Sequence, residues 1–437
     1  MRDYENLQQT SENRNKLRSY YIPEGISEYK LLNGEWKFAY FQRDIDVPEK
    51  IEKWDTIPVP SCWQLYGYEN PNYTNLNYPY PCDPPYVPDD NPCGVYEREF
   101  EISKKWGKLY FVLEGVSSCA YLSINGQYVG FTQGSHLQAE FDITDYVKKG
   151  ENTVSLQVFR WSDGSYLEDQ DGWRFSGIMR DVQLLHAPQS RICDYFARAE
   201  LDDKYEDAVL NVQVELGGVL EDGMSVKAVL SDDGKVVATM TGLVKSGNMT
   251  YNLSQEIRNP KKWTSETPEL YDVSLSLCDA RGKVLDYVSG RTGFRKIEVR
   301  DRVFLLNGQP VKMKGVNRVE HDPFTGKYVT KERVLAEVLQ MKRNNINTIR
   351  TAHMPAVEWL YEFCDEYGIM VIDEANVEAH GMGYNEKSLA HKSEWKDAHV
   401  ARLVNMMERD KNHPCIMMWS LGNETDNGAN LEAMYHA

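Results

Sequence analysis

The sequence lacks any long hydrophobic run. No stretch approaches the roughly 20 consecutive apolar residues that span a bilayer. Residues 1–20 are polar and charged, without the apolar stretch of about 7–15 residues that marks a secretory signal. We therefore expect no membrane partner and a cytoplasmic location.

Paired cysteine motifs and an excess of positive charge are also missing. The 8 cysteines contain no Cys-x-x-Cys pair, which argues against a zinc site and is typical of reduced structural thiols. Lys and Arg total 49 against 66 Asp and Glu, and the net charge of −17 repels nucleic acid and anionic surfaces. We therefore expect no nucleic-acid partner and a neutral substrate.

The composition that remains is that of a folded globular protein. Hydrophobic residues make up 41% and charged residues 26%, close to ordinary usage. A chain of 437 residues is longer than one hydrophobic core usually supports, so the length predicts roughly three domains.

The first part of the chain has the pattern of a β-sandwich. Short alternating strands run from about Leu31 to His186, and Asn33-Gly34 and Asn125-Gly126 are hairpin signals. Residues 70–92 are too rich in proline for central sheet and predict a long surface loop, a place where function often lies.

A second set of strands follows residues 187–190. It includes Ala208–Leu216, Ser225–Leu230 and Tyr271–Leu277, spaced by turns over roughly one hundred residues. This spacing predicts an immunoglobulin-like sandwich. We find no catalytic constellation in it and expect a spacer.

Beyond about Arg295, strands alternate with amphipathic helices. The predicted strands are Val311–Val316, Asn347–Thr351, Ile369–Asp373 and Cys415–Ser420, and the predicted helices are Lys331–Asn344, one opening at Pro355 and closing at Gly368, and Asp397–Asp410. No glycine-rich phosphate loop follows the first strand, which favours a (β/α)₈ TIM barrel over a doubly wound sheet. The residues present correspond to the first half of such a barrel, and we expect the natural polypeptide to be longer.

Polar residues cluster where each of these strands ends, as catalytic groups do in barrels. The segments are 317–321, 350–353, 373–380 and 422–424. A single His or Glu at a strand end is more often a hydrogen-bonded structural group, but four such ends converging on one mouth indicate a site. In glycoside hydrolysis one carboxyl group protonates the leaving oxygen, and Glu424 suits that role.

A metal site is a further hypothesis. Glu378 and His380 lie two residues apart and could point the same way, with Glu424 nearby. Two carboxylates and one imidazole suit a hard divalent ion such as Mg²⁺ or Mn²⁺. From spacing alone, an ion-paired histidine in a polar cleft explains the same residues equally well.

Two extended motifs resemble signatures of the β-galactosidases of glycoside hydrolase family 2. The first is Asn347-Thr348-Ile349-Arg350 through His353, Asp365 and Tyr367-Gly368; the second runs from Asp410-Lys411-Asn412-His413-Pro414 to Trp419-Ser420-Leu421-Gly422-Asn423-Glu424. The likeness covers nearly the whole chain, and residues 161–171 are similar to the β-galactosidase branch in particular.

The resemblance implies a fold and an activity. It implies a jelly-roll β-sandwich at 1–187, an immunoglobulin-like β-sandwich at 188–295 and the first half of a TIM barrel at 296–437. The implied reaction is hydrolysis of terminal β-galactosides such as lactose with retained configuration. The nucleophile is expected on a later barrel strand, beyond residue 437, so these residues alone are expected to be inactive. A homo-oligomer is also implied.

The resemblance also assigns roles to individual residues. Glu424 is implied as the acid/base, and the residues implied to bind the sugar are Asn75, Asp171, Arg350, His353 and Asn423. Glu378, His380 and Glu424 are the implied ligands of Mg²⁺, and Asp171 is implied to lie near a Na⁺ ion. Val319 departs from the pattern, since the family usually has His there, and so do Met354 and Gly172.

Two other functions stay open. One is a noncatalytic carbohydrate-binding or complementing fragment. The other is a different exo-glycosidase of the same family such as a β-glucuronidase, which would need cationic groups for the substrate carboxylate.

Overall fold

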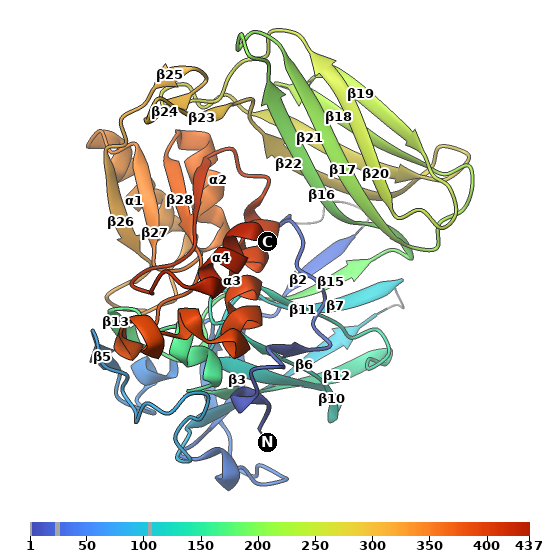
Figure 1. The fold of residues 1–437 in the computed structure, drawn as a ribbon. Helices are drawn as coiled ribbons and strands as arrows, with labels where there is room; N and C mark the ends of the chain where they lie inside the picture. Colours follow the sequence, from blue (N-terminus) through green and yellow to red (C-terminus); the bar gives the residue numbers. More distant parts are fainter. Residues whose placement is uncertain (1, 22–26, 104–106) are drawn as a thin grey trace.

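The computed structural model describes residues 2–21, 27–103 and 107–437. Three bodies follow one another along the chain (Figure 1): a blue-to-green sandwich, a yellow-green sandwich and an orange-to-red part in which parallel strands alternate with helices. The fold class predicted from the sequence is confirmed, including an incomplete barrel.

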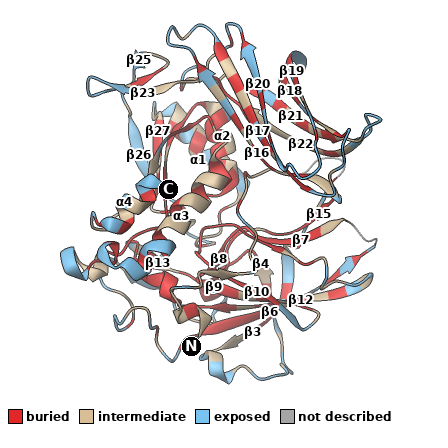
Figure 2. Cartoon of the chain, turned by 45° about the vertical axis from the view of Figure 1, so that its right-hand side comes forward, coloured by how far each residue is buried: buried red, intermediate tan, exposed pale blue. Residues whose placement is uncertain are grey.

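The first body is built from two facing antiparallel sheets. The larger has the order β1 (Ser11–Glu12), β10 (Gln127–Gln133), β9 (Cys119–Ile124), β12 (Gly150–Phe159), β6 (Cys93–Ile102), β3 (Gly34–Phe41) and β4 (Asp55–Val59). The smaller has the order β11 (Ala139–Asp142), β7 (Lys108–Leu113), β15 (Val182–Ala187) and β2 (Glu28–Leu31). Alternate residues of both sheets form one apolar core that includes Trp36, Phe38, Tyr96 and Phe111. Figure 2 shows this burial along the strands.

Of the two predicted hairpins, one is confirmed and one is wrong. Asn125 and Gly126 join β9 to β10, and both have the positive φ that this turn requires. The turn at Asn33-Gly34 instead passes the chain between the two sheets, because β2 pairs with β15 while β3 pairs with β4 and β6. The Asn33 side chain stabilises this crossing by donating to Asp181 at 2.8 Å and accepting from the Val182 N–H at 3.0 Å.

The long loop predicted at 70–92 is largely irregular, as expected. Its one described strand is β5 (Asn72–Thr74), which pairs with β13 (Gly172–Arg174). A second short pair, β8 (Val116–Ser117) with β14 (Gly177–Ile178), lies in the same body.

The second body is the predicted immunoglobulin-like sandwich. One sheet has the order β16 (Ser190–Leu201), β17 (Ala208–Gly218) and β20 (Thr250–Ile257). The other has the order β19 (Lys235–Leu243), β18 (Ser225–Asp232), β21 (Tyr271–Cys278) and β22 (Val284–Thr292). Its apolar core is separate from that of the first body.

The third body begins with the antiparallel strands β23 (Ile297–Arg300), β24 (Val303–Leu306) and β25 (Gln309–Pro310). The parallel strands β26 (Gly315–Val319), β27 (Thr348–Ala352), β28 (Met370–Glu374) and β29 (Ile416–Ser420) follow in sheet order. The helices are α1 (Lys331–Arg343), α2 (Glu358–Tyr367), α3 (Lys396–Asp410) and α4 (Ala429–His436). No helix in the described ranges is long and apolar enough to cross a membrane.

Short 3₁₀ turns occur in the first and third bodies. They are η1 (Asp3–Glu5), η2 (Asp44–Asp46), η3 (Trp63–Tyr66), η4 (Asp163–Leu167), η5 (His380–Met382), η6 (Asn385–Lys387), η7 (Leu389–His391) and η8 (Ser393–Trp395). Of these, η4 and η5 lie beside the candidate site.

Three details of the third body differ from the predictions. Strand β26 begins at Gly315, four positions after the predicted start, because residues 309–310 belong to the preceding antiparallel sheet. Helix α2 begins at Glu358 and not at Pro355. On α3 the predicted core face, Val400, Val404 and Met407, is only half-buried, whereas the buried set includes Arg402, Leu403, Met406 and Arg409. The first body contacts α3 through Arg402, which gives this helix a polar buried face that periodicity does not show.

Candidate active site

Polar residues that follow parallel strands β26 to β29 come together at the carboxyl ends of those strands. Arg350 on β27 donates from Nη2 to the Asn423 side-chain oxygen at 2.9 Å, across 73 positions of sequence. Since Asn423 follows β29, this contact joins strand ends that are not neighbours in the sheet. The convergence expected from a barrel is therefore present.

A buried carboxylate, Glu374 at the end of β28, organises this edge. Its oxygens accept from Arg350 Nε at 2.7 Å and the Ser420 hydroxyl at 2.7 Å, and lie 2.8 Å from His353 Nδ1. Burial alone would raise the pKa of Glu374, but these three hydrogen-bonding partners outweigh it and hold the pKa below its ordinary value. Glu374 therefore stays an anion that orients Arg350 and His353.

Sequence reasoning did not assign Glu374 a role. The available signal was its position, since it ends an apolar strand within the polar segment 373–380. Its partners lie 21 to 46 positions away, so only the fold shows what the carboxylate holds.

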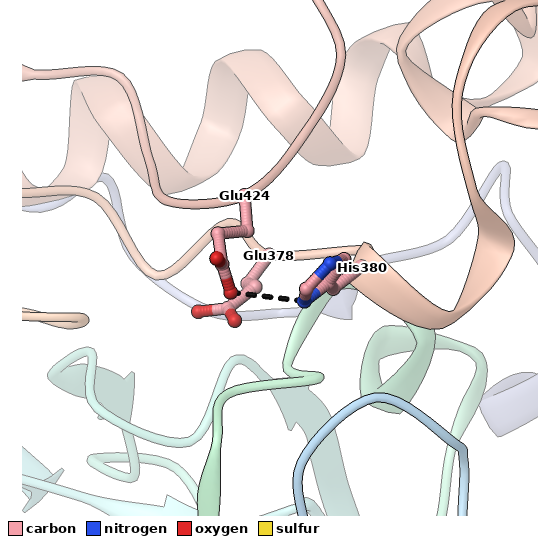
Figure 3. A group of neighbouring side chains, drawn as sticks. All are labelled: Glu378, His380 and Glu424. Atoms are coloured by element: carbon pink, nitrogen blue, oxygen red, sulfur yellow. Dashed lines mark ion pairs between the residues drawn. The ribbon is translucent and has the colours of Figure 1, made fainter.

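Glu378, His380 and Glu424 form a compact cluster at the same edge (Figure 3). One potential ligand atom from each side chain lies within 4.8 Å of the others, and His380 Nδ1 is 2.9 Å from Glu424 Oε2. Glu378 is fully buried, and neither of its carboxylate oxygens makes a well-aligned hydrogen bond in the described part of the chain, although the Asn423 side chain lies close enough to lower its pKa. Burial raises the pKa of Glu378 to about 7, and the nearby Glu424 charge acts in the same direction.

These residues fit a divalent cation. A buried carboxylate with no well-aligned hydrogen bond is costly, and a cation between Glu378, His380 and Glu424 would satisfy it. Two carboxylates and one imidazole are the donor types suited to a hard ion. The cluster therefore favours a metal over a simple ion pair of His380.

Glu424 itself is accessible, with 44% of its side chain exposed. It lies on the loop after β29, where Asn423 donates its N–H to the Val377 carbonyl at 3.0 Å. Gly422 makes this close approach possible, because a Cβ there would lie 2.4 Å from the same carbonyl and its φ is +146°. Glu424 is thus held on a fixed loop at the carboxyl end of β29.

The two jelly-roll residues lie at one end of the two-stranded sheet formed by β5 and β13. Asn75 directly follows β5, Asp171 directly precedes β13, and both are exposed. The Tyr73 hydroxyl donates to Asp171. Among the described residues, neither side chain hydrogen-bonds to the barrel, and a single carboxylate does not by itself form a sodium site.

Of the three departures from the family pattern, Val319 is the one that faces the open edge. It ends β26 with 56% of its surface exposed, so an apolar group stands where the family usually has an imidazole. Met354 is buried in the structure and Gly172 begins β13.

Family profiles match almost all of the chain. The "Glycosyl hydrolases family 2, sugar binding domain" matches residues 29–188, the profile "Glycosyl hydrolases family 2" matches 190–295, and the "TIM barrel domain" of the same family matches 297–437.

Curated relatives agree with this assignment. A β-galactosidase of Alteromonas mediterranea is 42% identical over 93% of this chain and 41% of its own length, and one of Pectobacterium atrosepticum is 41% identical over 92% of this chain and 40% of its own. The chain thus spans about two fifths of the length of these relatives.

Among solved structures, a Bifidobacterium dentium β-glucuronidase complexed with coumarin-3-O-glucuronide aligns with a TM-score of 0.78 at 23% identity, over 96% of this chain and 72% of its own. A Ruminococcus gnavus β-glucuronidase in complex with D-glucaro-δ-lactam aligns with a TM-score of 0.78 at 24% identity, over 96% and 71% of the two chains. These two likenesses concern the fold. With its three matched domains and its curated relatives, the chain belongs to glycoside hydrolase family 2.

Proposed function

We propose that the polypeptide carrying this chain is a retaining β-galactosidase that hydrolyses terminal β-D-galactosides such as lactose. The observation that carries the proposal is the placement of Glu424, accessible and beside His380 and Glu378 at the carboxyl end of the fourth parallel strand. The names of the relatives at 41–42% identity support the galactoside over other sugars.

The proposed role of Glu424 is acid/base catalysis. Its carboxyl group would donate a proton to the glycosidic oxygen as the aglycone leaves, and would then take a proton from the water that attacks the glycosyl intermediate. A retaining mechanism also needs a nucleophilic carboxylate about 5–5.5 Å away. The family resemblance assigns it to a later barrel strand, outside these 437 residues.

His353 and Asn423 would bind the sugar, and Arg350 would help shape the site through its contacts to Glu374 and Asn423. Asn423 and His353 are oriented through Arg350 and Glu374, so their polar atoms are fixed before a substrate arrives. A neutral polyhydroxylated sugar is recognised by such directional groups, because a substrate lacking one hydroxyl leaves a partner unpaired. Asn75 and Asp171 are proposed to contact the sugar from the first domain, on the strength of the resemblance.

Glu378, His380 and Glu424 would hold Mg²⁺ or Mn²⁺. When bound, the ion would supply a fixed positive charge beside the acid/base carboxyl group. The Na⁺ near Asp171 rests on the resemblance alone. A homo-oligomer and a cytoplasmic location are likewise proposals.

A β-glucuronidase is the second candidate, because solved structures of that activity share the fold. A glucuronide needs a free cation for its carboxylate. Arg350 is engaged by Glu374 and Asn423, so it offers its charge to the protein and not to a substrate.

Glu424→Gln in the complete polypeptide tests the proposal. Hydrolysis of a poor-leaving-group galactoside such as lactose should fall by about 10²–10⁴-fold, and hydrolysis of an activated aryl β-galactoside should fall less. Glu432→Gln, on the exposed face of α4, is the matched control. Equal losses on both substrates would contradict the acid/base role. If the unmodified protein hydrolyses an aryl β-glucuronide faster than the corresponding aryl β-galactoside, the second candidate is favoured.

A further inference from the structure

The barrel loop that carries Glu378 and His380 is paired, backbone to backbone, with the jelly roll. The Glu378 N–H donates to the Leu167 carbonyl at 2.8 Å, and the Asp169 N–H donates to the Glu378 carbonyl at 3.1 Å. Glu168 and Glu378 therefore form a parallel β-bridge between domains. The N–H and the carbonyl of Glu378 are therefore both paired with the first domain, while the barrel holds the neighbouring Val377 carbonyl through the Asn423 N–H.

Asp169 extends this contact to the other ligand of the same loop. Its fully buried carboxylate accepts from the Gly381 N–H at 2.7 Å and from Arg174 Nη2 at 3.0 Å. Gly381 directly follows His380 within η5. A Cβ on Gly381 would lie 2.5 Å from the Leu76 carbonyl and 2.9 Å from Asp169 Oδ2, so the loop is closely packed against the jelly roll here.

The start of the loop is held by the same jelly-roll segment. Gln170 donates from Nε2 to the Asn376 side-chain oxygen at 2.9 Å. Arg402 on α3 donates to both the Asn376 carbonyl at 2.9 Å and the Glu168 carboxylate at 2.7 Å. Residues 168–170 thus contact the loop before, at and after Glu378.

We propose that Asp169 is a positioning residue for the metal site, fixing the distance and direction between Glu378 and His380 from the neighbouring domain. The proposal rests on the proposed metal role of these two residues. Asp169 is not one of the three proposed ligands. It acts through the Gly381 N–H on the His380 side and through its own N–H on the Glu378 side. Partners of this kind outside the ligand shell typically contribute about 10–100-fold in metal affinity.

Titration of Mn²⁺ into the complete, metal-free polypeptide tests this, with isothermal calorimetry and the loss of free-ion electron paramagnetic resonance signal as readouts. Asp169→Ala should weaken binding by about 10–100-fold. Asp169→Asn keeps an oxygen that can accept from Gly381 and should restore most of the affinity. A merely structural role would not produce that rescue.

Asp286→Ala is the matched control. Asp286 is also buried and accepts from a backbone N–H and a hydroxyl, those of Ile192 and Ser27, but it lies in the second domain. Asp286→Ala should lower the midpoint temperature of thermal unfolding and leave the Mn²⁺ affinity unchanged. Arg174→Met removes the ionic partner while keeping Asp169, and should weaken Mn²⁺ binding a few-fold even if Asp169→Ala folds poorly.

The outcomes separate this proposal from the proposed function. Unchanged Mn²⁺ affinity in both Asp169→Ala and Arg174→Met, with tight binding by the unmodified protein, would overturn the positioning role and leave the metal site standing. If the unmodified protein and Glu378→Gln bind Mn²⁺ equally, the ligand assignment fails and the positioning role fails with it.

Discussion

The barrel part has two neighbours, and they contact opposite ends of its strands. The jelly roll contacts segments that follow the strands: Arg180 donates to Glu320 at 2.8 Å and to the Pro355 carbonyl at 2.7 Å, and residues 167–170 contact the loop at 376–381. The immunoglobulin-like domain and its linker contact the segment that precedes β29 and the last turn of α2, through Asn412, Pro414 and Asp365. Figure 1 shows the two sandwiches on different sides of the barrel strands.

This difference separates function from support. In TIM barrels the carboxyl ends of the strands carry the active site, and the amino ends contribute to stability. The jelly roll therefore contacts the loops of the candidate site, whereas contacts of the immunoglobulin-like domain should affect only folding and assembly. Variants on the two sides test this comparison directly.

Arg402→Met on the jelly-roll side should have the largest effect on stability. Arg402 is 4% exposed and donates to the Glu168 carboxylate and to the carbonyls of Asn376 and Gly164. Its removal leaves the Glu168 carboxylate without its ionic partner, with only the Ser135 N–H and hydroxyl still donating to it, at a cost of about 3–5 kcal/mol in the free energy of unfolding. Urea denaturation measures this loss, and Mn²⁺ affinity should fall too. Arg281→Met, at an exposed turn, is the control. If Arg402→Met loses as little stability as Arg281→Met, the predicted difference between the two sides of the barrel is wrong.

Stability on this side should also depend on pH through Asp163. Burial raises the pKa of this η4 carboxyl to about 7. An acid with a raised folded pKa stabilises the fold fully below its unfolded pKa, near 4, and this contribution is lost as pH rises through about 7. The full difference corresponds to roughly 4 kcal/mol at most. Thermal unfolding of Asp163→Asn should therefore show a smaller loss between pH 5 and pH 8 than the unmodified protein.

Asp142→Asn provides the opposite sign as a control. Burial would raise the pKa of Asp142, but hydrogen bonds from Lys108 and Thr144 lower it below the ordinary value. At neutral and higher pH, Asp142→Asn should be less stable than the unmodified protein, because the stabilising charge of the Asp142 carboxylate is then missing. A pH profile of Asp163→Asn identical to that of the unmodified protein would show that Asp163 is not the titrating group.

Asn412→Ala on the other side should have the smallest effect. Its side chain accepts from the Ala197 N–H at 2.9 Å and donates to the Tyr195 carbonyl at 3.1 Å. The loss of two hydrogen bonds costs about 1–2 kcal/mol, with Mn²⁺ affinity unchanged. Asn248→Ala, at an exposed turn, is the control. A change in metal affinity for Asn412→Ala would show that both sides of the barrel communicate with the site.

Local pattern predicted most of the elements. Helix α1 lies within one residue of its predicted end, and Val334, Val338 and Met341 are buried as expected, because apolar period and capping are local properties. The turn at Asn33-Gly34 and the buried face of α3 were wrong. Both depend on which distant segment packs against them.

The residues of the candidate site also divide into those that the local sequence predicted and those that depend on distant partners. Glu378, His380 and Glu424 were predicted from the sequence to lie together, because strand ends in a barrel converge, and the structure places one potential ligand atom of each within 4.8 Å of the others. The contacts of Glu374 and Asp169 were not predicted, since their partners lie up to 212 positions away. No periodicity connects such residues, and only the packed domains show what their carboxylates hold.

The bridge between Glu168 and Glu378 also has a consequence for folding during synthesis. Translation delivers the jelly-roll segment long before the barrel loop, and N-terminal domains generally fold first. The loop around Glu378 is therefore expected to pair with jelly-roll backbone at residues 167–169 that has already folded. A recombinant that takes its first domain from a relative has to keep the segment around Glu168 compatible with the loop around Glu378. We therefore expect the two segments to be inherited together.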